Sequence, residues 1–465
     1  MKNMKDIAKN TFEKFTPGLT RILTNIGWLT IEKILQMGIN IFVGIWLARF
    51  LGPEKFGIYS YALAFVALFG SFASFGLQGI VVRDVVRNPD HKDVILGSTF
   101  ILKLIGAGLA FTIIAVSIIF TRPGDWLTIS LVIILAVQLP FRAFNTIDLW
   151  FQSKVKAKNI VYVNSSTVIL GASAKLILIF MQAPLPMFAA VLSAEAFLTA
   201  LGLIFVYRID GHSIFKWRPR LTVSKELIKQ SWLLLLSGIG AILYLKIDQL
   251  MLGEMVNSTE VGIYSAAVKL SESWYFIPTF VAASVFPAMI KSKDLSKDLY
   301  ETRLQQLLDC MSWLALFVAI PISFSASYII SILFGDDYVN AGPILAIHIW
   351  ACIFIFFGEV LSKWLINEGL LIFSPIRHGT GAIVNILLNF WLIPFYGGVG
   401  AAVATLISYA FASYLACFFY PKTRPAGVMM TFALFVPIRT ALKVLTYWKQ
   451  WRLLNNSKKF EPNSR

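Results

Sequence analysis

Charged residues are scarce in this chain. Asp, Glu, Lys and Arg make up 14% of its 465 residues, whereas an ordinary soluble domain carries about 25%. Hydrophobic residues make up 57%, and the mean hydropathy is +0.72. These values exclude a string of soluble domains, a disordered chain and a collagen-like fibre. We therefore expect most of the chain to lie in lipid.

Cysteine and histidine are also rare, with three and four residues respectively. Cys310, Cys352 and Cys417 stand alone within apolar segments, and no pair has the spacing of a metal site or a redox motif. This excludes a scaffold built on disulfides. We expect all three cysteines to be buried packing residues, and we expect neither a bound metal nor a cofactor.

Long apolar runs recur along almost the whole chain, each long enough to cross a hydrocarbon core of about 30 Å. Spans of this length must be helical, because lipid offers no partner to exposed backbone groups; continuous runs also exclude a β-barrel. Twelve spans are predicted, at 24–49, 57–80, 94–120, 126–150, 159–182, 186–207, 229–252, 262–289, 305–333, 343–366, 374–393 and 397–420. The fold class is therefore an all-α polytopic membrane protein.

The net charge of +16 reflects 41 basic residues against 25 acidic ones. Most of the basic residues fall before the first span, in alternate loops and in the tail. The intervening loops are poor in them and hold acids such as Glu254 and Asp336. The positive-inside rule then places both termini in the cytoplasm. The positive net charge thus reflects the topology of the chain in the membrane. We therefore expect no nucleic-acid partner. The polar start runs directly into a full-length span, so we expect no cleaved signal peptide.

An internal repeat is suggested by two identical tetrapeptides. Gly57-Ile58-Tyr59-Ser60 opens the second span and Gly262-Ile263-Tyr264-Ser265 opens the eighth, each after a helix that ends in Leu-Gly. The alternative is chance similarity between two glycine-bearing helix starts. A repeat of six spans would give parallel halves related by an axis along the membrane normal, as in alternating-access transporters.

The predicted organisation follows from this repeat. Residues 1–210 form an N-terminal six-helix bundle, 211–228 a basic cytoplasmic linker, and 229–420 a C-terminal six-helix bundle. Residues 421–465 form a basic cytoplasmic tail. Within it, 426–448 is apolar but interrupted by Pro437, Arg439 and Lys443, which favours a helix lying on the inner leaflet over a further span.

Four segments carry a resemblance to a known family. They are Leu51–Ser60 (LGPEKFGIYS), Leu149–Gln152 (LWFQ) with the basic cluster after it, Asp248–Gly253 (DQLMLG) and Ile393–Ala402 (IPFYGGVGAA). In order and spacing they resemble the polysaccharide transporters, the Wzx-type O-antigen flippases of the multidrug/oligosaccharidyl-lipid/polysaccharide superfamily. The resemblance covers residues 20–420, nearly the whole membrane region.

The resemblance implies a MATE-like fold of two six-helix bundles around a central cavity. It implies translocation of undecaprenyl-diphosphate-linked oligosaccharide across the bacterial cytoplasmic membrane, by alternating access and with coupling to protons or other cations. Membrane lipids, a polysaccharide polymerase and a chain-length regulator are the partners to expect. We know of no strict residue signature for substrate choice in this family, so no binding residue is transferred from it.

Charged side chains within the spans are the candidate functional groups, because a charge in the bilayer needs a partner or a wet cavity. A diphosphate carries about two negative charges, and cations lining a cavity would lower the barrier to its passage. The substrate-binding candidates are Lys103, Arg142, Lys175, Lys246 and Lys269. The last three lie about two turns from the outer ends of their helices, so they could instead extend to the lipid headgroups.

Acids within the spans are candidates for ion coupling. Burial favours the neutral form of a carboxyl group, which suits exchange of a proton. The candidates are Glu195, Glu272, Glu359 and Asp248. Two alternatives are structural: Glu272 could pair with Lys269 one turn away, and Glu195 could pair with a cation of another helix.

A small-molecule exporter and a membrane enzyme are the two alternative functions. A MATE-like exporter of small molecules or drugs would share the fold, but a cavity for organic cations would be more acidic. A membrane polymerase or glycosyltransferase usually needs a large extramembrane loop with acids, His or Arg, whereas the largest loop here has about 20 residues. We therefore expect a transporter and not an enzyme.

Overall fold

The computed structural model describes residues 2–442, 445, 446 and 448, and this part of the chain contains helices and turns but no strand. The helices are α1 (Lys2–Ser74), α2 (Gln78–Arg87), α3 (Lys92–Thr121), α4 (Trp126–Ala136), α5 (Gln138–Arg142), α6 (Thr146–Ser153), α7 (Ala157–Phe180), α8 (Leu185–Ile209), α9 (Leu221–Met255), α10 (Ser258–Glu272), α11 (Ile277–Leu295), α12 (Lys297–Phe334), α13 (Ala341–His348), α14 (Ala351–Asn367), α15 (Phe373–Ser413) and α16 (Arg424–Leu434).

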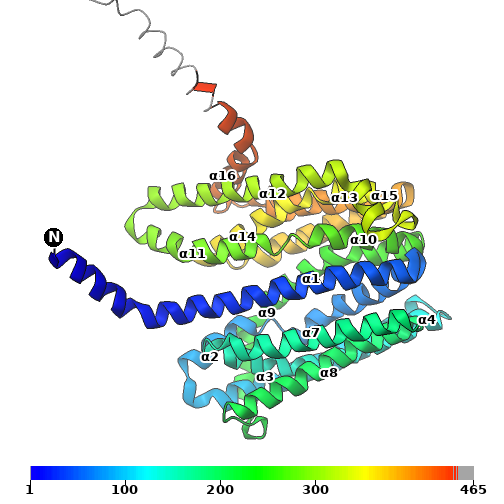
Figure 1. The fold of residues 1–465 in the computed structure, drawn as a ribbon, viewed down its shortest axis with the longest axis horizontal. Coiled ribbons are helices and arrows are strands. Elements are labelled where there is room, and N and C mark those ends of the chain that lie inside the picture. Colours follow the sequence, from blue (N-terminus) through cyan, green and yellow to red (C-terminus); the bar gives the residue numbers. More distant parts are fainter. Residues whose placement is uncertain (1, 443–444, 447, 449–465) are drawn as a thin grey trace, which may run out of the picture.

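Nine helical stretches of the described chain are long and apolar enough to cross a membrane, or ten if α16 and the bent helix after it form one more. Two of the nine contain a glycine out of helical conformation, Gly52 in α1 and Gly397 in α15, both with positive φ. Residues on both sides of Gly52 line one cavity, so the chain reverses there (Figure 1). An L side chain would be strained at both glycines.

The predicted spans all have helical counterparts. The span predicted at 126–150 is divided among α4, α5 and α6, the one at 262–289 between α10 and α11, and the one at 343–366 between α13 and α14. The two long helices α1 and α15 each supply two predicted spans, one on either side of the glycine. The all-α polytopic fold is therefore confirmed, with helices more often broken than the apolar runs predict.

The helices form two layers, with α2 to α8 on one side and α10 to α16 on the other (Figure 1). The first layer is joined by contacts of α7 with α8 and of α4 with α8, and the second by contacts of α12 with α13 and α14 with α15. Helices α1 and α9 lie between the layers, and α1 contacts α3, α7, α9 and α10. Whether these layers are two parallel repeats stays a prediction.

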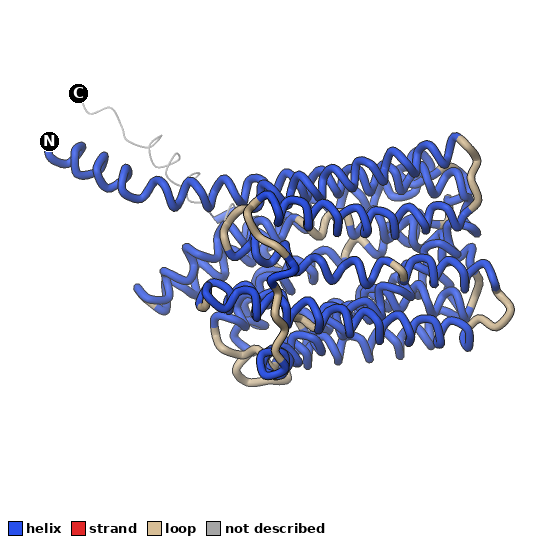
Figure 2. The backbone as a smooth tube through the Cα atoms, turned by 90° about the horizontal axis from the view of Figure 1, so that it is seen from below, coloured by secondary structure: helices blue, strands red, loops and turns tan. Residues whose placement is uncertain are grey.

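The ends of the bundle differ. The first residues of α1 lie at one end, with the basic loops around Lys92, Lys156 and Arg218; we call it the basic end (Figures 1 and 2). Gly52, Arg122, Val256 and Gly397 lie at the opposite, distal end. Loops rich in basic residues therefore share one side, as the sequence predicts.

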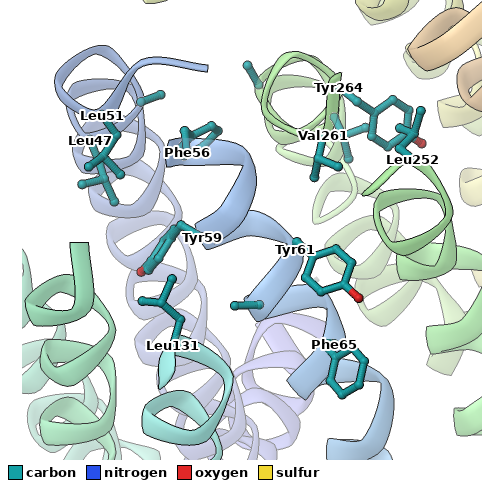
Figure 3. Close-up of a cluster of buried hydrophobic side chains, with 14 of the residues drawn as sticks. Leu47, Leu51, Phe56, Tyr59, Tyr61, Phe65, Leu131, Leu252, Val261 and Tyr264 are labelled. Atoms are coloured by element: carbon teal, nitrogen blue, oxygen red, sulfur yellow. The ribbon is translucent and has the colours of Figure 1, made fainter. Parts of the chain in front are cut away.

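The largest apolar cluster closes the distal end. It joins both legs of α1, α4, α9 and α10, and Figure 3 shows Leu47, Tyr59, Leu131, Val261 and Tyr264 in this cluster. All five side chains are buried. Since the cluster contains residues of both layers, burial of apolar surface holds the layers together here.

The two tetrapeptides of the suggested repeat meet in this region. A Cβ added to Gly57 would lie 1.7 Å from the carbonyl oxygen of Ser258, and one added to Gly262 would lie 1.9 Å from the carbonyl oxygen of Pro53. Ser258 stands in the same place relative to Gly262 as Pro53 does to Gly57. This reciprocal contact is the pattern that a two-fold axis between the motifs would give.

Polar contacts across the layers reinforce the distal end. The Arg122 guanidinium lies 2.8 Å from the Glu254 carboxylate, which also accepts a hydrogen bond of 2.6 Å from the Tyr61 hydroxyl. Arg49 donates to the carbonyl oxygen of Ile332 at 2.7 Å. Because these contacts join the predicted halves 1–210 and 229–420, the distal end must lose them if the halves separate there.

One expectation about the second layer needs correction, and the predicted tail is described only in part. Cys352 and Cys417 are buried as predicted, but Cys310 is exposed on the surface of α12, so the prediction of three buried thiols is wrong there. Within the predicted tail, α16 buries Ala426, Gly427 and Met430 and packs on α12, and the chain then bends by 58°. The predicted surface helix at 426–448 lies partly outside the described residues, and the end of the tail at 449–465 lies wholly outside them.

We predict that Gly262→Ala destabilises the closed distal end. The added methyl group would meet the backbone of Pro53, which cannot rotate away, and overpacking of this kind costs about 1–3 kcal/mol. Thermal unfolding of the purified protein in one detergent should show a lower midpoint. Gly38→Ala in α1 is the control, since nothing lies within 4 Å of its added Cβ. Equal midpoints for the two variants would contradict the prediction.

Candidate functional site

A cavity of about 630 Å³ lies between the layers, within the size range of ligand sites. Both legs of α1 line it, together with α5, α7, α8, α9 and α10. Its polar lining residues are Asn40, Ser60, Ser71, Gln138, Arg142, Lys175, Glu195, Lys246, Gln249, Ser265, Lys269 and Glu272. We call it the central cavity. It brings together four of the five predicted cations and two of the four predicted acids.

Lys175 and Glu195 form an ion pair within the first layer. Lys175 Nζ lies 2.6 Å from Glu195 Oε1, and their side chains are 10% and 19% exposed. Gly171 makes room for the pair, because a Cβ there would lie 1.7 Å from the same oxygen. Glu195 therefore pairs with a cation of another helix, which is the structural alternative given for it in the sequence analysis.

Lys246 and Glu272 form a second pair, across α9 and α10. Lys246 Nζ lies 3.1 Å from each carboxylate oxygen of Glu272. The alternative in which Glu272 pairs with Lys269 on its own helix is not what the structure shows. The three lysines also do not extend to the lipid headgroups, because Lys175, Lys246 and Lys269 all line the cavity.

The other two cations of the central cavity have no ion-pair partner among the described residues. Arg142 donates a hydrogen bond of 2.6 Å to the neutral Gln138 side chain. Lys269 has neither a hydrogen bond nor an ion pair in the described chain, and its ammonium occupies space left by Gly44, where a Cβ would lie 1.7 Å from Nζ. Four cations and two carboxylates leave the cavity with two unbalanced positive charges.

A second cavity of about 500 Å³ adjoins the central one and shares Gly70, Leu139 and Arg142 with it. Lys103 lines only this second cavity, with Asp148, Gln78, Asn145 and Ser74 as further polar residues. It extends to the turn between α1 and α2 at the basic end. Lys103 is therefore separated from the other three lysines, and Arg142 is the cation common to both cavities.

Asp248 lines neither cavity. Its side chain is 2% exposed and lies inside the second layer, where its carboxylate accepts hydrogen bonds from the hydroxyls of Tyr264 and Thr405 and the amide of Asn389. None of its described hydrogen-bond or ion-pair partners carries a positive charge. The buried Asn389 Oδ1 beside it has no hydrogen-bond partner among the described residues.

Glu359 also lies outside both cavities. It pairs with Lys363 one turn further along α14, at 3.6 Å. A partly exposed pair at this spacing is a common stabilising feature of a helix. Of the four predicted coupling acids, three thus face a lysine and Asp248 alone faces only neutral groups in the described part of the chain.

Several polar residues of the site are not among the candidates drawn from the sequence. Gln249 is buried and lines the central cavity next to Asp248 in sequence. Outside the two cavities, Glu32 is 6% exposed and accepts hydrogen bonds from Gln36 and Asn164. The polar stripe that contains Glu32 is visible in the sequence, whereas its contact with α7 depends on packing. No group of three or more His, Cys, Asp or Glu side chains in the described residues could hold a metal.

A polar cavity between two layers of membrane-spanning helices is the arrangement of a transporter. Residues 22–293 match the model of the family described as "Polysaccharide biosynthesis protein", and the chain belongs to this family. The resemblance to polysaccharide transporters is thereby confirmed.

Relatives with names of this kind match most of the chain. The "Probable low-salt glycan biosynthesis flippase Agl15" of Haloferax volcanii is 24% identical over 399 residues, which cover 82% of this chain and 80% of the relative. The "Putative O-antigen transporter" of Shigella flexneri is 25% identical over 380 residues, covering 77% and 88%.

Solved structures of two transporters have a similar fold. The lipid II flippase MurJ in an inward closed conformation matches with a TM-score of 0.65 and 13% identity, covering 94% of this chain and 99% of that one. An inward-facing MATE-family multidrug transporter matches with a TM-score of 0.62 and 15% identity, covering 91% and 99%. At these identities the matches establish the fold, and the predicted MATE-like architecture is confirmed.

We predict that Gly44→Ala displaces the ammonium of Lys269 without unfolding the protein. The added methyl group would occupy the place of a flexible side-chain end, which can move at little cost. Binding of inorganic pyrophosphate to the purified protein should fall as much as in Lys269→Met, while the thermal midpoint stays near that of Gly38→Ala. Wild-type pyrophosphate binding by Gly44→Ala would contradict the prediction.

Proposed function

We propose that this protein is a flippase for undecaprenyl-diphosphate-linked oligosaccharide in the bacterial cytoplasmic membrane. The observation that carries the proposal is the pair of unbalanced cations, Arg142 and Lys269, in a cavity between two helix layers. A diphosphate brings about two negative charges, which would leave this cavity near neutrality.

The physical problem is to move that charge through a hydrocarbon layer. Transfer of an isolated ion into low dielectric costs of the order of 20 kcal/mol in the Born limit. A preformed pair of cations offsets much of this cost, and a polar cavity keeps the sugars hydrated. The polyprenyl chain needs no polar path, because it can remain in the lipid beside the protein.

The ion pairs of Lys175 and Lys246 have a separate role in this proposal. With all four cations unpaired, the empty cavity would hold four like charges, which repel one another strongly where little water screens them. Glu195 and Glu272 reduce that repulsion. The protein can therefore present two cations to the substrate and remain stable without it.

Alternating access follows from the closed distal end. If both termini are cytoplasmic, as the positive-inside rule predicts, the distal end faces the outside and this structure is closed outward. Outward opening would separate Gly57 from Gly262 and break the contact of Arg122 with Glu254. We propose that the two predicted halves rock about this region.

Asp248 is the proposed coupling group. A carboxylate inside the bilayer needs a counter-charge, and none of its described contacts supplies one. A proton or a small monovalent cation would meet that need, and the unpartnered Asn389 oxygen lies in the same cluster. Glu195, Glu272 and Glu359 remain lesser candidates because each already has a lysine partner.

The second candidate function is a drug exporter of the same fold, because a multidrug transporter is among the structures that this chain matches. The unbalanced charge of the cavity is positive, which repels organic cations. A catalytic role has no support in the described cavities. A polysaccharide polymerase and a chain-length regulator stay proposed partners, because the flipped substrate would require polymerisation.

We predict that Arg142→Ala and Lys269→Ala each reduce surface polysaccharide. Cells lacking the gene should accumulate lipid-linked oligosaccharide on the cytoplasmic face, and the intact gene should restore the polymer. Loss of one unpaired cation should cost at least tenfold in flipping rate, since a charge-assisted contact contributes about 1.5–3 kcal/mol. Surface polymer and membrane protein level are measured together.

The control is the double variant Lys175→Met/Glu195→Gln, which removes an ion pair without changing the net charge of the cavity. It should keep more activity than either single cation variant. Normal polymer in Arg142→Ala would remove that residue from the mechanism. Normal polymer with increased sensitivity to cationic drugs in gene-deleted cells would support the exporter instead.

We predict that Asp248→Asn abolishes the dependence of transport on an imposed ion gradient. The amide keeps the shape of the side chain but removes the charge that a coupling cation would balance. Binding of undecaprenyl diphosphate should be unchanged, because Asp248 lines neither cavity. Proteoliposomes with imposed proton or sodium gradients give the measurement. Glu359→Gln is the control, and equal gradient dependence in both variants would assign coupling elsewhere.

A further inference from the structure

The second cavity differs from the central cavity in its chemistry. Its polar side chains comprise two cations, Lys103 and Arg142, one carboxylate, Asp148, two amides, Gln78 and Asn145, and one hydroxyl, Ser74. The second cavity therefore offers both hydrogen-bond donors and acceptors. In the central cavity, the charged groups without an ion-pair partner are both cations. The two cavities suit different parts of a ligand.

Three of the polar side chains of the second cavity are unused by the protein itself, whereas Arg142 donates to Gln138 and Ser74 donates to the Ser71 carbonyl. Lys103, Gln78 and Asn145 make no hydrogen bond or ion pair with another described residue. Lys103 and Asp148 line the same space without forming an ion pair, although their charges are opposite. Gln78 and Asn145 are exposed and Lys103 is partly buried, so their side chains are free to contact water or a polar ligand.

Hydroxyl groups of a sugar fit this set. Each hydroxyl donates one hydrogen bond and accepts others, so it can bind a carboxylate, an amide or an ammonium. A phosphate accepts hydrogen bonds but at neutral pH donates few, and it would be repelled by Asp148. The mixture of amides and a carboxylate thus favours a sugar over a second phosphate.

Arg142 fixes how the two parts of the ligand would be arranged. It lines both cavities, along with Gly70 and Leu139, so the cavities meet at its guanidinium. In a glycosyl diphosphate the first sugar is bonded directly to a phosphate. A group that contacts both cavities is therefore placed to contact the junction between phosphate and sugar.

We infer that the second cavity is a sugar subsite, which holds the first sugar of the substrate while Arg142 and Lys269 hold the diphosphate in the central cavity. The inference rests on the proposed function and deepens it. It assigns Asn145 and Gln78 to sugar recognition, with Lys103 and Asp148 across the same space. The sugar then lies toward the basic end, where the α1–α2 turn borders the cavity.

The test uses the full chain in nanodiscs and two probes. One is bare undecaprenyl diphosphate, and the other is the same lipid with a single N-acetylglucosamine on its diphosphate. Wild-type protein should bind the sugar-bearing lipid more tightly. Asn145→Ala and Gln78→Ala should each weaken binding of that lipid about fivefold, as expected for loss of one neutral hydrogen bond, and leave the bare lipid unchanged.

Two further variants separate this inference from the proposed function. Lys269→Ala should weaken both lipids alike, because both carry the diphosphate. Asn40→Ala, a matched amide that lines only the central cavity, should leave the ratio of the two affinities unchanged.

Equal losses for both lipids in Asn145→Ala and Gln78→Ala, or no loss for either, would overturn the sugar subsite and leave the diphosphate site standing. Failure of wild-type protein to bind either lipid would overturn both proposals. Equal wild-type affinity for the two lipids would overturn the subsite alone.

Discussion

The cost of an uncompensated charge within the bilayer governs the interior of this protein. Each ionisable side chain there needs a partner, a wet cavity or a ligand. Lys175 and Lys246 have carboxylate partners, Arg142 and Lys269 line a cavity, and Asp248 is surrounded by neutral donors. In the proposed mechanism these three solutions correspond to three roles: the pairs stabilise the resting protein, the unpaired cations receive an anion, and the lone carboxylate accepts a cation.

Small residues determine where these charges can stand. Gly44 and Gly171 carry no side chain, and the space they leave is filled by the ends of Lys269 and Glu195. Gly57 and Gly262 allow two helix starts to approach until backbone meets backbone. In a helical membrane protein, close approach of this kind commonly depends on glycine. The same residue type therefore shapes the cavity in the middle and its closure at the distal end.

Much of the fold and several residues of the candidate site could be predicted from the sequence, because a segment within lipid must be apolar and a charge there is rare. Runs of apolar residues predicted the spans, and the rarity of charge within them pointed to Arg142 and Lys269. Pairing across helices could not be predicted: Lys246 meets Glu272 only through the packing of α9 on α10. The cluster around Asp248 likewise needs Tyr264 of α10 and Asn389 of α15, which are distant in sequence. Cys310 was misjudged because an apolar helix exposes one face to lipid, where hydropathy does not distinguish surface from interior.

The two ion pairs of the central cavity join neighbouring helices of the same predicted half, α7 with α8 and α9 with α10. By contrast, Arg122 and Glu254 belong to segments that must part when the distal end opens. A rigid-body motion of one predicted half against the other would therefore leave each lysine with its own glutamate throughout a cycle. The charge balance of the central cavity would then be the same in every state, and only the arrival of the ligand would change it.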